Sequence, residues 1–184
     1  PENNTLTVGV SGDDSTGFIV EDNSILKYVG GVNFENPTDS DGNNVYNIQV
    51  FADDGFNRTT QDVEITVSDV PESPEFVGLD SDVFVEENVR IVTSISVVDP
   101  EGSGVSWGIN GGADESLFRT FNVDEANGSL AFIAFDGADY EEPTDANSDG
   151  IYEVQLRAVE DTAEALETII DLLITVTDIK DTYT

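Results

Sequence analysis

The chain has 184 residues, with 39 Asp and Glu against 6 Lys and Arg, a formal net charge of −33, and no Cys, Met or His. Its 38% hydrophobic content is enough for a packed core in one large domain or two small ones. The absence of thiolate and imidazole leaves hard oxygen ligands, which prefer calcium or magnesium. The few scattered cations exclude a nucleic-acid surface, and no apolar run is long enough for insertion into a membrane.

Apolar and polar residues alternate along several segments, which predicts half-buried β-strands. In chain order these segments are Tyr46 to Ala52, Glu64 to Val67, Ile91 to Val97, Tyr152 to Ala158 and Ile169 to Val176. Clusters of Asp, Asn, Ser and Gly separate the strands at short spacing, and we expect the stretch from Asp161 to Glu167 to be a loop. The pattern is typical of an all-β sandwich.

One part of the sequence is repeated. The segment Asn33 to Asp39 returns 106 residues later as Asp139 to Asp145, and Tyr46 and Tyr152 have the same spacing. Further on, Thr66 to Val70 returns as Thr175 to Ile179 with an offset of 109. Two copies of one domain type are therefore predicted.

The domain boundary is predicted near Pro71, in the acidic segment Asp69 to Glu75, because its two prolines cannot continue a central strand. This gives a first repeat at residues 1–70 and a second at residues 71–184. Since Leu6 to Ser11 matches Ser106 to Asn110, we expect the first repeat to be incomplete and to lack its first two strands. Another chain, a swapped strand or upstream sequence would then have to cover its open edges, so self-association through this domain is one expectation.

Three phrases of the second repeat resemble the cadherin-like domains of bacterial surface proteins. They are Ile109 to Asp114, Asn127 to Leu130, and Asp139 to Glu141 followed by Tyr152. The resemblance implies tandem Greek-key β-sandwiches joined by an acidic calcium-binding linker, with Ca²⁺ between successive repeats. The partners that it implies are neighbouring repeats of the same protein.

The resemblance also assigns metal ligands at the junction between the two repeats. Six acidic residues fall on motif positions there: Glu35, Asp69, Glu72, Asp99, Glu101 and Glu160. Asn33 and Pro71 depart from the motif, so we expect fewer than three ions. So many carboxylates could not share a small volume without divalent cations, because like charges a few ångströms apart repel or titrate to neutrality.

A second junction is implied at the far end of the second repeat. Its motif positions hold Glu87, Asp139, Glu141, Asp178 and Asp181. Lys180 is the one discordant residue in that linker.

A weaker candidate for ion binding is the loop that contains Asp145, Asn147 and Asp149, which opens like an EF-hand loop. Leu156 stands where such a loop has its bidentate Glu, and the first copy offers only Asp39, Asp41 and Asn43. A tight hairpin loop uses the same residue types without any ion, so both interpretations stay open.

The predicted function is structural: a non-enzymatic, calcium-dependent module that supports adhesion at the surface of a bacterium, or in a protein that it secretes, in a saline habitat. The alternative is a carbohydrate-binding module that contacts a surface polysaccharide. However, Trp107 is in phase with Val105 and Ile109 and is expected to face the core. A purely solvated acidic surface is the remaining interpretation of the charge.

Overall fold

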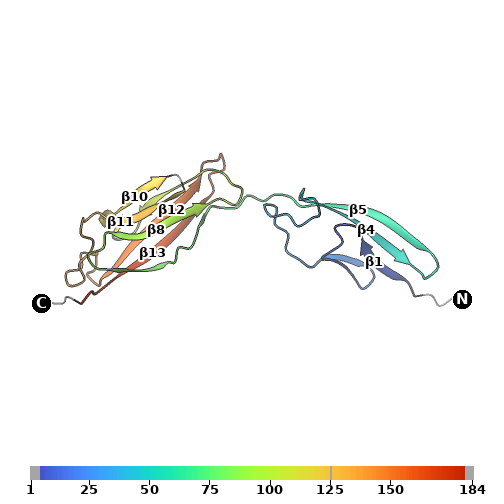
Figure 1. The fold of residues 1–184 in the computed structure, drawn as a ribbon, viewed down its shortest axis with the longest axis horizontal. Helices are drawn as coiled ribbons and strands as arrows, with labels where there is room; N and C mark the ends of the chain where they lie inside the picture. Colours follow the sequence, from blue (N-terminus) through green and yellow to red (C-terminus); the bar gives the residue numbers. More distant parts are fainter. Residues whose placement is uncertain (1–4, 125, 181–184) are drawn as a thin grey trace. The chain divides into compact units, whose positions relative to one another are not determined.

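The computed structural model describes residues 5–124 and 126–180. The chain forms two compact units, unit 1 from Pro1 to Val70 and unit 2 from Pro71 to Thr184. The described residues form β-strands, joined by turns and one short 3₁₀ helix, so the fold is all-β as predicted (Figure 1). No helix in the described part of the chain has the length and apolar character needed to cross a membrane.

Unit 1 contains a three-stranded antiparallel sheet of order β1-β4-β5 and a separate hairpin of β2 and β3. Its strands are β1 (Thr7–Ser11), β2 (Phe18–Glu21), β3 (Ile25–Tyr28), β4 (Val45–Asp53) and β5 (Arg58–Thr66). The hairpin turns through Asp22 and Asn23, which both have positive φ. These residue types tolerate that conformation better than most.

The interior of unit 1 is built around three aromatic rings from different strands. Phe18, Tyr28 and Tyr46 lie with ring centroids 4.8 to 5.6 Å apart in tilted and edge-on contacts. The hydroxyl of Thr38 is 2.7 Å from that of Tyr46 and 3.2 Å from that of Tyr28. The hairpin is therefore held on the larger sheet by aromatic packing and a polar link.

Unit 2 contains two four-stranded sheets, with strand orders β10-β11-β8-β6 and β7-β13-β12-β9. Its elements are β6 (Glu75–Phe76), β7 (Asp82–Glu86), β8 (Ile91–Val98), β9 (Val105–Gly111), the 3₁₀ helix η1 (Glu115–Leu117), β10 (Phe118–Asp124), β11 (Asn127–Phe132), β12 (Ile151–Glu160) and β13 (Glu167–Thr177). All pairings are antiparallel except that of β7 with β13.

The core of unit 2 lies between its two sheets. Leu130 of β11, Leu156 of β12 and Ile174 of β13 are fully buried, and they belong to one continuous apolar cluster. Phe118, Phe132 and Tyr152 repeat the aromatic triad of unit 1, with centroids 4.7 to 6.1 Å apart. The apolar faces of the two sheets thus pack against each other and form a β-sandwich.

The sequence repeat makes the strands of the two units equivalent. β1, β2, β3, β4 and β5 correspond in order to β9, β10, β11, β12 and β13. β6, β7 and β8 have no equivalent in the part of unit 1 that the structure describes. Unit 1 therefore has fewer strands to cover its core.

Candidate metal centres

The first cluster of carboxylates lies where β7 ends and β13 leaves the sheet. Glu87 is only 4% exposed. Its Oε1 accepts a hydrogen bond from the backbone N–H of Ile179 at 2.9 Å, and its Oε2 accepts one from Tyr140 at 3.2 Å. A buried carboxylate must be compensated in this way, and the two N–H groups fix the position of its oxygens.

Asp139 and Glu141 complete this cluster. Asp139 Oδ1 accepts hydrogen bonds from the backbone N–H groups of Glu141 and Glu142, at 2.9 and 3.0 Å, which closes a tight turn. One carboxylate oxygen from each of Glu87, Asp139 and Glu141 lies within 4.8 Å of the others. We call these three residues the β7-end cluster.

The β7-end cluster is electrostatically unfavourable without a cation. Burial raises the pKa of the Glu141 carboxyl above its ordinary value, and the negative charges of Glu87, Asp178 and Asp139 raise it further. A raised pKa means that the surroundings destabilise the charged form of the carboxyl. The same observation places Asp178 close enough to act on Glu141.

The raised pKa of Glu141 predicts a pH dependence. A carboxyl whose pKa is higher in the folded state than in the unfolded state stabilises the fold at pH values below its unfolded pKa. This stabilisation is lost as the pH rises through the folded-state pKa. Protons therefore compete with a cation in the window above the ordinary glutamate pKa of about 4.3. We expect calcium affinity, measured by calorimetry, to fall as the pH is lowered from 7 to about 5, with protons released on binding. An affinity that does not change with pH would contradict this.

A second cluster lies at the opposite end of the β12 and β13 pair. Asp99 follows β8, Glu101 lies in the next turn, and Glu160 is the last residue of β12. One carboxylate oxygen of each lies within 4.8 Å of the others, and Glu160 is only 6% exposed. We call Asp99, Glu101 and Glu160 the β8-end cluster.

Backbone donors hold part of the β8-end cluster in place. Asp99 Oδ1 accepts from the N–H of Ser103 at 2.9 Å, and Glu101 Oε1 from that of Glu72 at 2.7 Å. This bond from Glu72 is the main reason why the pKa of Glu101 is lowered. Among the described residues, no group donates a hydrogen bond to Asp99 Oδ2 or Glu101 Oε2. Two fixed carboxylates thus keep one oxygen each for another ligand.

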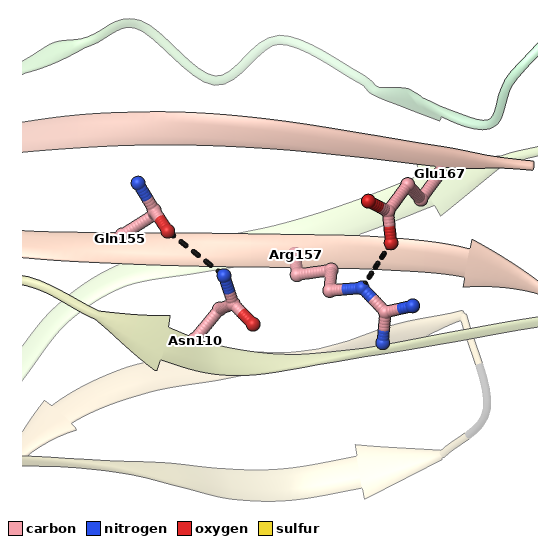
Figure 2. Close-up of polar contacts among 4 residues, drawn as sticks. All are labelled: Asn110, Gln155, Arg157 and Glu167. Carbon is pink, nitrogen blue, oxygen red and sulfur yellow. Dashed lines mark hydrogen bonds and ion pairs between the residues drawn. The ribbon is translucent and has the colours of Figure 1, made fainter.

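Ion pairs neutralise little of the charge. In the described parts of the chain, salt bridges join Lys27 to Glu21 and Arg157 to Glu167. Figure 2 shows the second pair, with Arg157 on β12 and Glu167 on β13, beside a hydrogen bond from Asn110 to Gln155. Both pairs lie outside the two acidic clusters.

The other predicted ligands are distributed as follows. Glu35 and Asp69 lie in unit 1, and their part in a site shared with unit 2 remains a prediction. Glu72 lies in unit 2, bonded through its backbone to Glu101. Asp181 lies outside the described residues.

The loop predicted as a weaker ion site is organised by its own backbone. Asp145 Oδ2 and Oδ1 accept from the N–H groups of Asp149 and Gly150, each at 3.0 Å, and Asn147 Nδ2 donates to Asp149 Oδ2. Burial acts to raise the pKa of Asp145, but these donors outweigh it and the pKa is lowered. These bonds account for the burial of the Asp145 carboxylate without an ion.

The first copy of this loop is built in the same way. Asp39 Oδ2 and Oδ1 accept from the N–H groups of Asn43 and Asn44, at 2.8 and 3.1 Å, and Asn43 Nδ2 donates to Asp41. Ion binding in either loop stays a prediction.

Sequence reasoning missed a buried carboxylate in each unit. Asp114 Oδ1 and Oδ2 accept from the backbone N–H groups of Ala146 and Glu153, at 2.6 and 2.8 Å. Asp14 accepts in the same way from Ser40 and Asn47, at 2.6 and 2.7 Å. The signal was the shared pattern of a Gly two residues before the Asp, which the repeat alignment contains.

Trp107 is the single tryptophan of the chain, and its exposure decides whether it can form a sugar-binding platform. It is 8% exposed and belongs to the apolar cluster of unit 2, which confirms the prediction that it faces the core. An aromatic platform for a sugar must lie open to solvent, so this residue does not provide one.

No family model matches the chain, and no curated protein does either. The chain is similar to solved cadherin structures: human protocadherin-24 EC1-2 (20% identity, TM-score 0.44, covering 96% of this chain and 84% of that one), Drosophila N-cadherin EC1-3 (19%, 0.44, 97% and 57%) and human CDH23 EC21-23 (15%, 0.47, 97% and 60%).

Proposed function

We propose that this chain is a calcium-binding structural module of a bacterial surface or secreted protein, without enzymatic activity. Calcium at the ends of its repeats would stiffen an array of such units and support adhesion. One observation carries the proposal: one carboxylate oxygen from each of Glu87, Asp139 and Glu141 lies within 4.8 Å of the others, with Asp178 also acting on Glu141. Such a group of charges is stable when a divalent cation is bound among them.

Calcium suits these residues better than other metals. The ligand set consists of hard oxygens at irregular spacing, and calcium accepts six to eight oxygens in flexible geometry, whereas magnesium demands a near-ideal octahedron. In the β8-end cluster, Asp99 Oδ2 and Glu101 Oε2 are free of hydrogen bonds from the described residues and can serve as ligands. The proposal extends to Glu35 and Asp69, which the sequence alone assigns to a junction.

A calcium titration followed by thermal melting tests the proposal. Extracellular modules bind calcium with Kd of about 0.1 to 1 mM, so at 10 mM one site adds about 1.5 to 3 kcal/mol to the free energy of unfolding. We expect the melting temperature to rise by several degrees between EDTA and 10 mM calcium. Sodium chloride at matched ionic strength is the control. An equal rise with sodium would mean that the acids form a solvated surface.

Variants of the β7-end cluster localise the effect. Glu141→Ala and Asp178→Ala should weaken calcium binding, while the apolar core stays intact. The first removes a carboxylate of the cluster, and the second removes a negative charge that acts on Glu141. Glu142→Ala is the matched control, since its side chain lies outside the clustered carboxylates. Calorimetry measures affinity and stoichiometry. Unchanged affinity and stoichiometry in both Glu141→Ala and Asp178→Ala would exclude this site.

A further inference from the structure

Two of the six cations of this chain lie close together in unit 2, around aromatic rings. The guanidinium carbons of Arg90 and Arg119 are each 5.6 Å from the centroid of the Phe121 ring, so they are separated by no more than twice that distance. The guanidinium carbon of Arg90 also lies 5.6 Å from the ring centroid of Phe135. We call Arg90, Arg119, Phe121 and Phe135 the Arg–Phe patch.

The chain itself does not neutralise the two guanidiniums of the Arg–Phe patch. Lys27 and Arg157 form ion pairs with glutamates, but no acid among the residues that the structure describes pairs with Arg90 or Arg119. Nε of Arg90 is buried and has no hydrogen-bond partner among the same residues. A buried donor without a partner is rare in folded proteins. In a chain with 39 acidic residues, these two guanidiniums are thus available to an anion from outside.

The exposed ring of the patch is presented by a braced loop. Phe135 lies between β11 and β12 and is 86% exposed. On one side of it, the backbone N–H of Ile133 donates a hydrogen bond to the C=O of Leu117 at 2.8 Å. On the other side, Gly137 has a φ of 84° and lies so close to the preceding turn that a Cβ would be 2.4 Å from the Val89 oxygen. The loop is therefore held in place before any ligand binds.

The Arg–Phe patch combines two kinds of recognition. A guanidinium binds a carboxylate through two parallel N–H donors. A flat, exposed aromatic ring packs against an apolar surface of similar size, and the C–H face of a sugar ring is such a surface. A sugar that carries a carboxylate, which is a uronate, presents both groups to the patch at once.

Charge selects among the anionic partners. The net charge of −33 repels dense polyanions such as DNA, which carries about one charge per 1.7 Å, and a second copy of the chain would bring its own −33. A uronate polymer spaces its carboxylates with neutral hydroxyl and C–H groups. At about 0.15 M salt the Debye length is about 8 Å, so a carboxylate at the patch is attracted by the two guanidiniums more than it is repelled by distant acids.

We propose that the Arg–Phe patch binds a uronate-containing polysaccharide, with carboxylates of one polymer chain on Arg90 and Arg119 and a sugar ring packed against Phe135. Phe121 contacts both guanidiniums through cation–π interactions and fixes their spacing. The site lies apart from the acidic clusters, and binding at it does not require calcium.

The test titrates the whole chain with an oligogalacturonate of about six sugars, followed by NMR, in about 0.15 M salt. EDTA is present, so that calcium cannot bridge the sugar to the acidic clusters. We expect the amide signals of residues 89–91, 119–121 and 133–137 to shift and to saturate. The methyl ester of the same oligosaccharide keeps the sugar rings without the charges, and it should bind about tenfold more weakly or less. Equal binding of the ester overturns the proposal, as does equal or tighter binding of an oligoglutamate of the same length.

Variants locate the binding site. Arg119→Gln and Phe135→Ala change exposed side chains, so the fold should persist, and each should weaken binding by about threefold or more. Arg90→Gln combined with Arg119→Gln should weaken it by about tenfold or more. Arg157→Gln is the matched control, because it removes the same charge at a guanidinium that Glu167 already occupies.

Two results with these variants would overturn the proposal. One is unchanged affinity in both Arg119→Gln and Phe135→Ala. The other is a loss in Arg157→Gln as large as that in Arg119→Gln, which would mean that only the net charge matters. Signals of the patch that shift with protein concentration in the absence of sugar would also overturn it, since a second copy would then occupy the patch.

Discussion

Replacement of Asp114 by Ala is expected to lower the free energy of unfolding of unit 2 by about 2 to 4 kcal/mol. The Asp114 carboxylate is 3% exposed and accepts hydrogen bonds from the backbone N–H groups of Ala146 and Glu153. It thus joins the start of η1 to the loop before β12 and to β12 itself. Hydrogen bonds to a charged acceptor contribute about 1.5 to 3 kcal/mol each, and the variant also leaves two N–H groups without a partner. Chemical denaturation followed by Trp107 fluorescence measures the change.

Two further variants separate this role from a general loss of charge. Asp114→Asn keeps one acceptor oxygen and should lose less stability than Asp114→Ala. Asp171→Ala removes an exposed carboxylate that bonds to Gln155, and it should change stability by less than about 0.5 kcal/mol. If Asp114→Ala behaves like Asp171→Ala, the two backbone hydrogen bonds are not what holds this loop.

Replacement of Ile174 by Ala is expected to cost about 3 to 4 kcal/mol. Ile174 is completely buried between the sheets of unit 2, and large-to-small substitutions of this kind lose both apolar burial and packing around the cavity that remains. The melting temperature of unit 2, followed by Trp107 fluorescence, should fall by more than ten degrees.

The same substitution at the equivalent position of unit 1 is the matched comparison. Ile65 is half-buried, so Ile65→Ala removes less contact and should cost less than half as much, measured by amide exchange in β4. Equal costs in the two repeats would mean that Ile65 contributes as much packing as the fully buried Ile174.

Alternation of apolar residues predicted β4, β8, β12 and β13 closely, but it marked only the last three residues of β5. The strands that the sequence predicts around Tyr46 and Tyr152 are β4 and β12, each slightly longer than the alternating segment itself. The hairpin of β2 and β3 was not predicted, because its turn at Asp22 and Asn23 lacks the Gly that marks most hairpins. The pairing of β7 with β13 joins segments about 90 residues apart, and no local pattern encodes it.

The candidate metal site was also predictable only in part. The acidic identity of Glu87, Asp139 and Glu141 could be read from motif positions, and the structure brings the three together. The burial of Glu87 and its two hydrogen bonds from backbone N–H groups could not be predicted from the sequence. They depend on Ile179 and Tyr140, which lie far from Glu87 along the chain. Asp114 and Asp14 were missed for the same reason: their acceptor role appears only when distant loops meet.

The parallel pairing of β7 with β13 also determines how unit 2 bears mechanical load. β7 lies near the start of this unit and β13 near its end, and the two strands run in the same direction. A pulling force applied to the two ends of the unit would slide one strand along the other, so that the bonds between them are loaded together in shear and do not open one at a time. Stretching of single molecules should therefore find unit 2 the more resistant repeat, and unit 1 the one that extends first.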